Sequence, residues 1–209
     1  MSAVTEIALP YFLARPASRR TATAGVVVIH EGPGISPQLL RFCQRLAGEG
    51  YAAVAPDLFF RAGGTQAADY AALMGSLVPD LVRSDLGAAA AVTRDVGAVK
   101  VGVTGFCMGG LLTYRAALAG GFDAAAGFYG ARIAQELGSP TCPTLLLFGD
   151  DDPYIPVEDI DTIRAHHPET VVYAGATHGF MRDGSESFHP DAAEDAWARL
   201  LAFFGEHLR

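Results

Sequence analysis

Short apolar segments alternate along this chain with longer segments of helical periodicity. Residues 24–30 (AGVVVIH) form a β-branched run between turn signals, which is typical of a buried strand. In residues 39–46 the apolar positions recur at helical spacing, behind a Ser36-Pro37 pair that suits the start of a helix. The same alternation continues to the end of the chain. It predicts further strands at 51–55, 100–104, 124–128, 144–148 and 170–173. It also predicts a helix at 79–96, a helix that follows residues 105–110 and ends at about 119, and helices at 157–166 and 191–208.

This order of elements predicts the fold class. Strands that alternate with helices form βαβ units, which give a mostly parallel sheet with helices on both faces. All 209 residues are expected to form a single α/β domain, because the length suits one core and no linker-like segment or repeat divides the chain. In such sheets the chemistry gathers at the C-terminal ends of the strands.

Composition and charge exclude several classes of function. The formal net charge is −8 and no basic stripe is visible, which argues against binding to a nucleic-acid backbone. No apolar run of about 18 residues is present, and no secretory signal is expected. Three cysteines without CxxC spacing fit a reducing cytoplasm better than a disulfide framework. We expect a cytoplasmic monomer or homodimer that acts on a small molecule, with no nucleic-acid or membrane partner.

The strand predicted at 100–104 runs directly into a Gly-x-Cys-x-Gly turn (GFCMGG, 105–110). Between a strand and a helix, this is the nucleophile-elbow pattern of α/β-hydrolases, with cysteine where serine is more usual. Such a turn strains its central residue, so Gly105 and Gly109 must be small. Cys107 then lies at a helix N-terminus, where backbone N–H groups and the helix dipole favour a thiolate. For the string alone, which also occurs by chance, a buried and inert cysteine would be the default interpretation.

Two polar residues follow later strands in the order that a hydrolase needs. Asp152 follows one strand in GDDDPYIP, and His178 follows the next in GATHGF, which completes the order nucleophile, acid, histidine. His178 would pair with the thiolate or take its proton and return it to the leaving group. Asp152 would fix the imidazole tautomer. The oxyanion would be bound by the N–H groups of Met108, after the nucleophile, and Gly32, after the first strand.

Several other reactive residue types have plainer interpretations. Cys43 lies on an apolar helix face and Cys142 just before a strand, so both are expected to be packed thiols. No His or Cys lies at ligand spacing from the acidic run 150–152, so we expect no metal and no cofactor. His30 fits pocket lining and a structural role equally. The remaining histidines, His166, His167, His189 and His207, are expected at helix ends or on the surface.

These motifs resemble the dienelactone hydrolase (carboxymethylenebutenolidase) family of α/β-hydrolases. The resemblance is carried, in the family's order and over nearly the whole chain, by HEGPG at 30–34, APDLFFR at 55–61, GFCMGG at 105–110, GDDD at 149–152 with IP at 155–156, and ATHGFMR at 176–182. It implies that Cys107, Asp152 and His178 are the catalytic triad.

The resemblance also implies roles for three charged residues. Glu31 matches a glutamate that hydrogen-bonds the resting thiol and helps to deprotonate it when substrate enters. Arg61 and Arg182 match two arginines that hold a substrate carboxylate, for which a guanidinium fork is well suited. The chain departs from the family at 32–34, where Gly-Pro-Gly stands in place of a bulky apolar residue. This difference predicts a less crowded entrance to the substrate pocket. The chain also looks short between residues 62 and 80, where part of the pocket wall would lie.

We therefore expect a cysteine hydrolase that opens a small lactone or enol ester carrying a carboxylate, through an acyl-thioester on Cys107. Two alternatives stay open at this point. One is a broad short-chain carboxylesterase or thioesterase with no need for a carboxylate. The other is a non-hydrolytic redox or electrophile sensor that uses Cys107.

Overall fold

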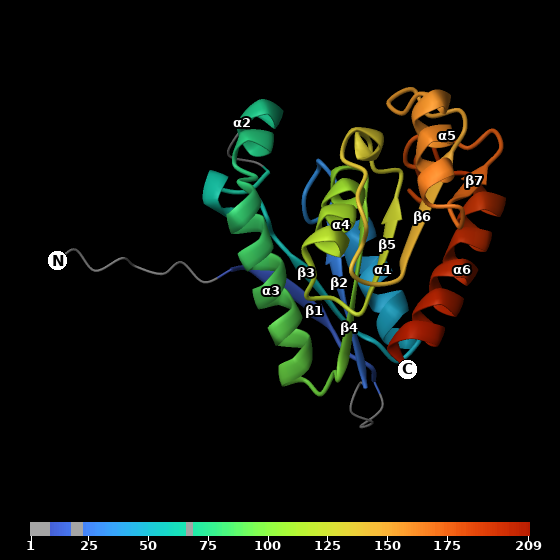
Figure 1. Cartoon of the computed structure of the whole chain (residues 1–209). Coiled ribbons are helices and arrows are strands. Elements are labelled where there is room, and N and C mark those ends of the chain that lie inside the picture. The colour runs from blue at the N-terminus through green and yellow to red at the C-terminus, as the bar shows by residue number, and fades with distance from the viewer. Residues whose placement is uncertain (1–8, 18–22, 66–68) are drawn as a thin grey trace.

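A single seven-stranded sheet organises the part of the chain described by the computed structural model, residues 9–17, 23–65 and 69–209 (Figure 1). The strand order is β1-β3-β2-β4-β5-β6-β7; β1 is antiparallel to β3, and the remaining pairs are parallel. The strands are β1 (Tyr11–Ala14), β2 (Ala24–Ile29), β3 (Ala52–Pro56), β4 (Lys100–Phe106), β5 (Ala124–Phe128), β6 (Thr144–Gly149) and β7 (Val171–Tyr173). The helices are α1 (Pro37–Gly48), α2 (Tyr70–Gly75), α3 (Pro79–Asp95), α4 (Met108–Ala119), α5 (Val157–His166) and α6 (Pro190–Leu208), with short 3-10 turns at Phe60–Ala62 and Ile133–Gln135.

The sheet is buried on both faces, which explains the continuous apolar runs of its strands. In β2, Val26 and Val28 belong to a core cluster with residues of α1 and α6, whereas Val27 and Ile29 belong to a second cluster with residues of α3 and α4. Gly102 lets α6 approach closely, because a Cβ there would lie 2.8 Å from Leu208. The predicted α/β class with a mostly parallel sheet is confirmed.

The predicted strands and helices are present, with boundaries that agree to within two residues. Two elements were not predicted. Strand β1 has only four residues and lies half-exposed at an edge, with Tyr11 paired to Pro56, so it carries little apolar pattern. Helix α2 is six residues long and is capped by Asp69, whose side chain accepts from the N–H of Ala72. It occupies part of the segment 62–80 that looked short for the family, of which residues 66–68 lie outside the described structure.

All parallel strands end at the same edge of the sheet. The loops after β2, β4, β6 and β7 carry Glu31, Cys107, Asp152 and His178 respectively, so residues far apart in the sequence meet at this edge. Among the described helices, none combines the length and the apolar character that crossing a bilayer would require.

Candidate active site

Cys107 has the strained backbone that the glycine pattern predicts. It joins β4 directly to α4 with φ of 55° and ψ of −118°, a region that non-glycine residues rarely occupy. Its neighbours allow this turn only because they lack side chains. A Cβ at Gly105 would lie 2.4 Å from the carbonyl oxygen of Gly109, and a Cβ at Gly109 would lie 2.5 Å from that of Ile29. The nucleophile elbow is therefore present, with the thiol at its tip.

Two backbone N–H groups near this turn are available to a ligand. Met108 is the first residue of α4, so its N–H has no partner within the helix. Among the described residues, neither the N–H of Met108 nor that of Gly32 donates a hydrogen bond. Gly32 is not bare, however, because a Cβ there would lie 2.8 Å from Cε2 of Tyr70. The entrance beside Gly32, which was expected to be less crowded, is therefore occupied by the ring of Tyr70 from α2.

His178 and Asp152 are joined by a short hydrogen bond. His178 Nδ1 lies 2.7 Å from Oδ2 of Asp152, and both side chains are buried. The other oxygen, Oδ1, accepts from the N–H of Tyr154 at 2.9 Å, which orients the carboxylate. Burial disfavours the imidazolium, but the hydrogen bonds and charges of Asp152 and Cys107 outweigh it and raise the pKa of His178 to about 9. Since Nδ1 is used by Asp152, Nε2 is the nitrogen available to Cys107.

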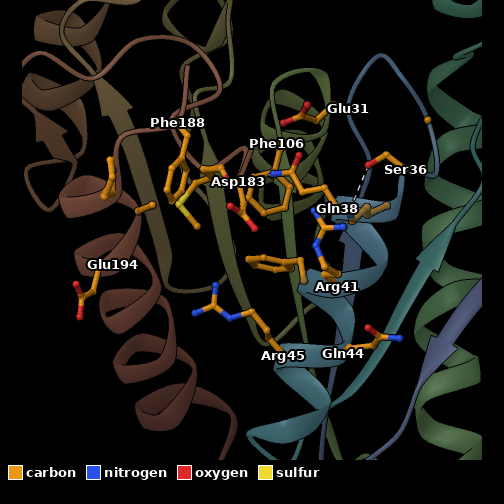
Figure 2. A pocket seen from close by; sticks show the side chains of 16 residues that line it. Glu31, Ser36, Gln38, Arg41, Gln44, Arg45, Phe106, Asp183, Phe188 and Glu194 are labelled. Atoms are coloured by element: carbon orange, nitrogen blue, oxygen red, sulfur yellow. Dashed lines mark hydrogen bonds between the residues drawn. The ribbon is translucent and has the colours of Figure 1, made fainter. Parts of the chain in front are cut away.

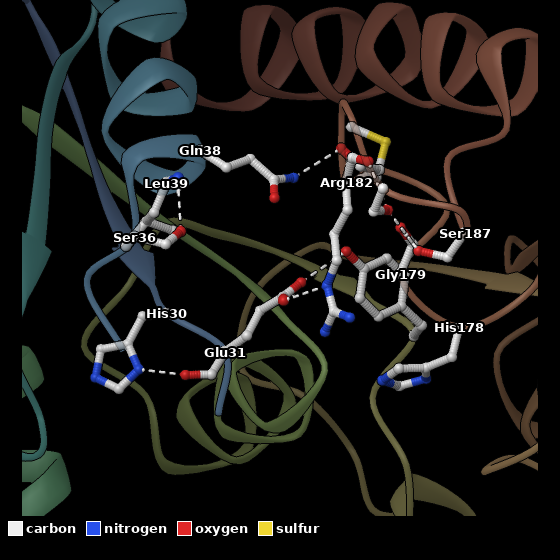
Figure 3. Close-up of polar contacts among 12 residues, drawn as sticks. His30, Glu31, Ser36, Gln38, Leu39, His178, Gly179, Arg182 and Ser187 are labelled. Atoms are coloured by element: carbon white, nitrogen blue, oxygen red, sulfur yellow. Dashed lines mark hydrogen bonds and ion pairs between the residues drawn. The ribbon is translucent and has the colours of Figure 1, made fainter. Parts of the chain in front are cut away.

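Glu31 lies at the centre of a second polar group, shown in Figure 3. Its Oε2 accepts from Nε of Arg182 at 2.6 Å, and its Oε1 accepts from the hydroxyl of Tyr129 at 2.9 Å. Burial and the charge of Glu31 hold the pKa of Tyr129 well above its usual value, so this phenol remains a donor. The resemblance implied a contact between Glu31 and the resting thiol. In this structure the carboxylate bonds instead to Arg182 and Tyr129.

Arg182 is folded back over the loop that carries His178. Gly179, with φ of 82°, makes this possible, because a Cβ there would lie 3.1 Å from Cδ and Cζ of Arg182. The guanidinium contacts Glu31 through Nε, and within the described part of the chain its two terminal nitrogens have no hydrogen-bond partner. They are free to receive an anion beside the proposed nucleophile.

Arg61 has a different partner. Its Nη1 and Nη2 donate to Asp85 of α3 at 2.5 and 2.8 Å, and the Asp85 side chain is buried. The ion pair ties the 3-10 turn that carries Arg61 to α3. Arg61 is thus not among the residues that gather around Glu31, and its role toward a substrate stays a prediction.

Three tyrosines near the site were not predicted from the sequence. The ring centroids of Tyr129 and Tyr154 lie 5.0 and 4.9 Å from that of His178, and Tyr70 lies against Gly32. Tyr129 has a positive φ of 38°. A single aromatic residue after a strand is most often part of the core, so the sequence carried little signal for them. The position of Tyr154, two residues after Asp152, was the best available indication.

His30, whose role was left open, is structural. Its Nε2 accepts from the N–H of Leu58 at 3.1 Å. Its Nδ1 donates to the carbonyl of Glu31 at 2.7 Å (Figure 3). Burial lowers the pKa of His30, in keeping with a neutral ring. It therefore braces the loop that carries Glu31.

The other predicted thiols and histidines are largely as expected. Cys43 is fully buried, and burial raises its pKa to about 12; burial also raises the pKa of Cys142. His167 lies at a helix end, as expected: it caps the C-terminus of α5, where it is buried and hydrogen-bonded to the hydroxyl of Tyr114 at 2.9 Å.

The acidic run 150–152 has a structural role at its first residue. Asp150 accepts from the N–H of Gly175 at 2.7 Å, as a turn residue would. Within residues 9–17, 23–65 and 69–209, no group of three or more His, Cys, Asp or Glu side chains is arranged to hold a metal ion.

A cavity of about 750 Å³ lies beside the site, between α1 and α6 (Figure 2). Glu31 and Phe106, the residue before Cys107, form part of its wall, but Cys107 and His178 do not. Glu31, which bonds to Arg182 and Tyr129, therefore also lines this cavity.

A strained cysteine at a strand–helix elbow, followed in chain order by a hydrogen-bonded aspartate and histidine at the same edge of a parallel sheet, defines the α/β-hydrolase class. Comparison with known proteins gives the family. Residues 9–208 match the model of the dienelactone hydrolase family, and the chain belongs to it.

Individual relatives are similar over most of their length. The chain is 35% identical over 224 residues to a Salmonella typhimurium protein named "Putative carboxymethylenebutenolidase", covering 95% of this chain and 83% of the relative. A Methylorubrum extorquens protein of the same name is 32% identical over 208 residues, covering 87% of this chain and 72% of the relative. A crystal structure named "Putative Dienelactone Hydrolase", from Klebsiella pneumoniae, is 29% identical with a TM-score of 0.80, covering 95% of this chain and 93% of that one. The protein is thus a hydrolase of this family.

Proposed function

We propose that this protein is a cysteine-dependent carboxylic ester hydrolase that opens a small lactone or enol ester bearing a carboxylate. The observation that carries the proposal is the buried His178–Asp152 hydrogen bond beside the strained Cys107. A histidine with a pKa of about 9 carries a proton at neutral pH, and it can therefore hold Cys107 as a thiolate.

The reaction follows from this pair. The Cys107 thiolate attacks the ester carbonyl carbon, and the carbonyl electrons move onto the oxygen, where the N–H groups of Met108 and Gly32 bind the oxyanion. Collapse of this intermediate breaks the bond to the ring oxygen and leaves an acyl-thioester. The ring-opened group departs as a stabilised enolate, whose expulsion needs little help from an acid, and it then takes the proton of His178, which leaves the imidazole neutral. His178, oriented by Asp152, then deprotonates a water that attacks the thioester, which releases the acid and regenerates the thiolate.

Arg182 gives the proposal its substrate class. The terminal nitrogens of its guanidinium can bind a carboxylate through two charge-assisted hydrogen bonds. Glu31 holds the Nε edge of the same guanidinium, and Tyr129 in turn holds Glu31. With these contacts, the role of Glu31 in the proposed reaction is to orient Arg182 for the substrate carboxylate. A direct contact with the thiol would require Glu31 to leave one of these two partners.

Replacement of the nucleophile tests the proposal. Cys107→Ala should abolish hydrolysis of dienelactone and of p-nitrophenyl acetate. The matched control is Cys142→Ala, which removes another partly buried free thiol and should retain activity. Intact turnover in Cys107→Ala would contradict the catalytic assignment. Absence of any ester turnover by the wild type, with a sulfenic acid on Cys107 under mild oxidant, would favour a sensor instead.

A second candidate is a broad short-chain carboxylesterase or thioesterase. One observation favours it: Arg61 is engaged by Asp85, so of the two arginines that the resemblance implies, only Arg182 presents free nitrogens to the site. Lactones and short esters assayed in pairs, with and without a carboxylate, separate the two candidates. A preference of more than about tenfold for the anionic member supports the carboxylate requirement. Equal rates support the broad esterase.

We also propose a reducing location such as the cytoplasm. The nucleophile must remain a thiol to act, and Cys43, Cys107 and Cys142 are all free. Each step above uses only residues of this chain and water. Cys107 should therefore react with iodoacetamide in protein isolated without reductant, which mass spectrometry would detect.

A further inference from the structure

The cavity between α1 and α6 is lined by charged groups that the proposed reaction does not use (Figure 2). Arg41 and Arg45 line it from α1. Two carboxylates line it from other elements, Asp183 from the loop after β7 and Glu194 from α6. Across the described residues, none of these four side chains takes part in an ion pair. Both signs of charge are therefore available to a ligand.

The two arginines are arranged to receive an anion. They lie four residues apart and so share one face of α1, a helix that contains no aspartate or glutamate to compete for them. Arg45 reaches across to α6, where Cζ of its guanidinium lies 4.0 Å from the centre of the Trp197 ring. This contact occupies the face of the guanidinium, so its N–H edges stay available to a carboxylate.

The remaining wall of the cavity suits a small, mostly apolar molecule. Its apolar residues are Leu39, Phe42, Phe106, Met181 and Phe188. A volume of about 750 Å³ with few polar groups is typical of small-molecule sites. Gln38 adds one amide acceptor. Its Nε2 donates to the carbonyl of Met181 at 2.9 Å, and within the described part of the chain its Oε1 accepts no hydrogen bond.

These groups restrict the chemistry of the ligand. A simple carboxylate would face the unpaired charges of Asp183 and Glu194, and a simple amine would face those of Arg41 and Arg45. Glu31 also lines the cavity, but Arg182 and Tyr129 already bind its carboxylate. An apolar molecule with a positive group at one end and a negative group at the other would satisfy both sets of charges.

We infer that this cavity is a binding site for a free dipeptide with apolar side chains. The C-terminal carboxylate binds to Arg41 and Arg45, and the N-terminal ammonium binds to Asp183 and Glu194. The peptide N–H donates to Oε1 of Gln38, and the two side chains pack on the apolar wall. Because both termini are recognised, a segment inside a longer chain does not satisfy the site. No step of the proposed reaction enters this inference.

Binding of matched peptides tests the site without requiring turnover. Leu-Phe carries both terminal charges, N-acetyl-Leu-Phe only the carboxylate, and Leu-Phe amide only the ammonium. In titration calorimetry the full chain should bind Leu-Phe more tightly than either blocked form, by roughly three- to tenfold, because each exposed charge pair adds a modest amount. Equal binding of the three peptides, or no binding of Leu-Phe, would overturn the inference.

Substitutions assign each terminus to its wall. Arg41→Gln/Arg45→Gln should bind Leu-Phe roughly three- to tenfold more weakly and should no longer distinguish it from Leu-Phe amide. Asp183→Asn/Glu194→Gln should no longer distinguish Leu-Phe from N-acetyl-Leu-Phe. If either double variant keeps the wild-type preference for the free terminus, the peptide does not lie as proposed.

Arg94→Gln is the matched control. Arg94 is also exposed and without an ion pair in the described structure, but it lies on α3, which packs on the other face of the sheet. Its substitution should leave Leu-Phe binding unchanged, and a loss there would place the peptide on the wrong face. Cys107→Ala should bind Leu-Phe as the wild type does. A wild type that binds Leu-Phe but hydrolyses no ester would overturn the proposed function and leave this site standing.

Discussion

Arg182 Nε lies 2.6 Å from Glu31 Oε2, in an ion pair between residues 151 positions apart in the chain. It joins the loop after β2 to the loop after β7, and so it fixes the guanidinium against the same edge of the sheet that carries Cys107. Glu31 contacts one edge of the guanidinium only. The orientation of the free edge is therefore set before any ligand arrives, which lowers the entropy that binding must overcome.

Arg182→Ala should raise KM for anionic lactones by roughly 10- to 100-fold and leave neutral esters nearly unchanged. A hydrogen bond to a charged group contributes about 1.5–3 kcal/mol, and the variant removes the group that would supply it. Steady-state kinetics on a lactone with and without its carboxylate provide the measurement. Arg182→Lys keeps the charge but loses the planar fork, so its KM for anionic lactones should lie between those of the wild type and Arg182→Ala. Equal losses on both substrates would exclude a carboxylate-binding role.

Arg61→Ala should act mainly on stability. Removal of the guanidinium leaves the buried carboxylate of Asp85 without its partner, which we expect to lower the free energy of unfolding by about 1–3 kcal/mol. Urea denaturation would measure this loss. In the double variant Arg61→Ala/Asp85→Ala no buried charge is left unpaired, so part of the stability should return. A rise in KM for anionic lactones as large as that in Arg182→Ala would instead place Arg61 in the substrate site.

Gly109→Ala should disrupt the elbow, whereas a matched helical glycine should tolerate the same change. A Cβ at Gly109 meets the carbonyl oxygens of Ile29 and His30 at 2.5 and 2.7 Å, and neither backbone atom can move away cheaply. We expect a loss of more than about 3 kcal/mol or failure to fold. Gly87 in α3 has open space around it, so Gly87→Ala should stabilise by about 0.5–1 kcal/mol. Thermal denaturation of both variants is the measurement, and similar midpoints would contradict the packing argument.

The parts of this fold that the sequence predicted are those whose pattern is local. Strands buried on both faces are continuous apolar runs, and the elbow needs two glycines at fixed spacing around Cys107. The order of Asp152 and His178 behind successive strands then placed them at one edge, because parallel strands end together. Strand β1 and helix α2 are too short for their apolar residues to show a strand or helix periodicity, so they appeared only in the structure.

The partners of the charged residues could not be predicted, because they depend on tertiary packing. Glu31 bonds to Tyr129, 98 residues away, and nothing near either residue indicates the other. The local sequence around Arg61 suits a substrate or a neighbouring helix equally well, and its ion pair with Asp85 on the buried face of α3 arises from tertiary packing. Glu31 and Arg182 lie together in the structure, and the bond between them is a finding that the resemblance did not imply.

The raised pKa of His178 makes the stability of this protein depend on pH in a defined direction. Its folded-state pKa of about 9 exceeds the ordinary value of 6.5, so the imidazolium's favourable contacts are fully present below pH 6.5. Their contribution, up to roughly 3 kcal/mol, is lost as the pH rises through 9. Urea denaturation between pH 6 and pH 10 should show this fall. In Asp152→Asn one of the two groups that stabilise the imidazolium, Asp152 beside Cys107, is neutralised, so the fall should become smaller. Asp150→Asn, in the same loop but bonded to Gly175, is the control and should keep the wild-type dependence. An unchanged pH dependence in Asp152→Asn would mean that the His178–Asp152 bond is not what holds this proton.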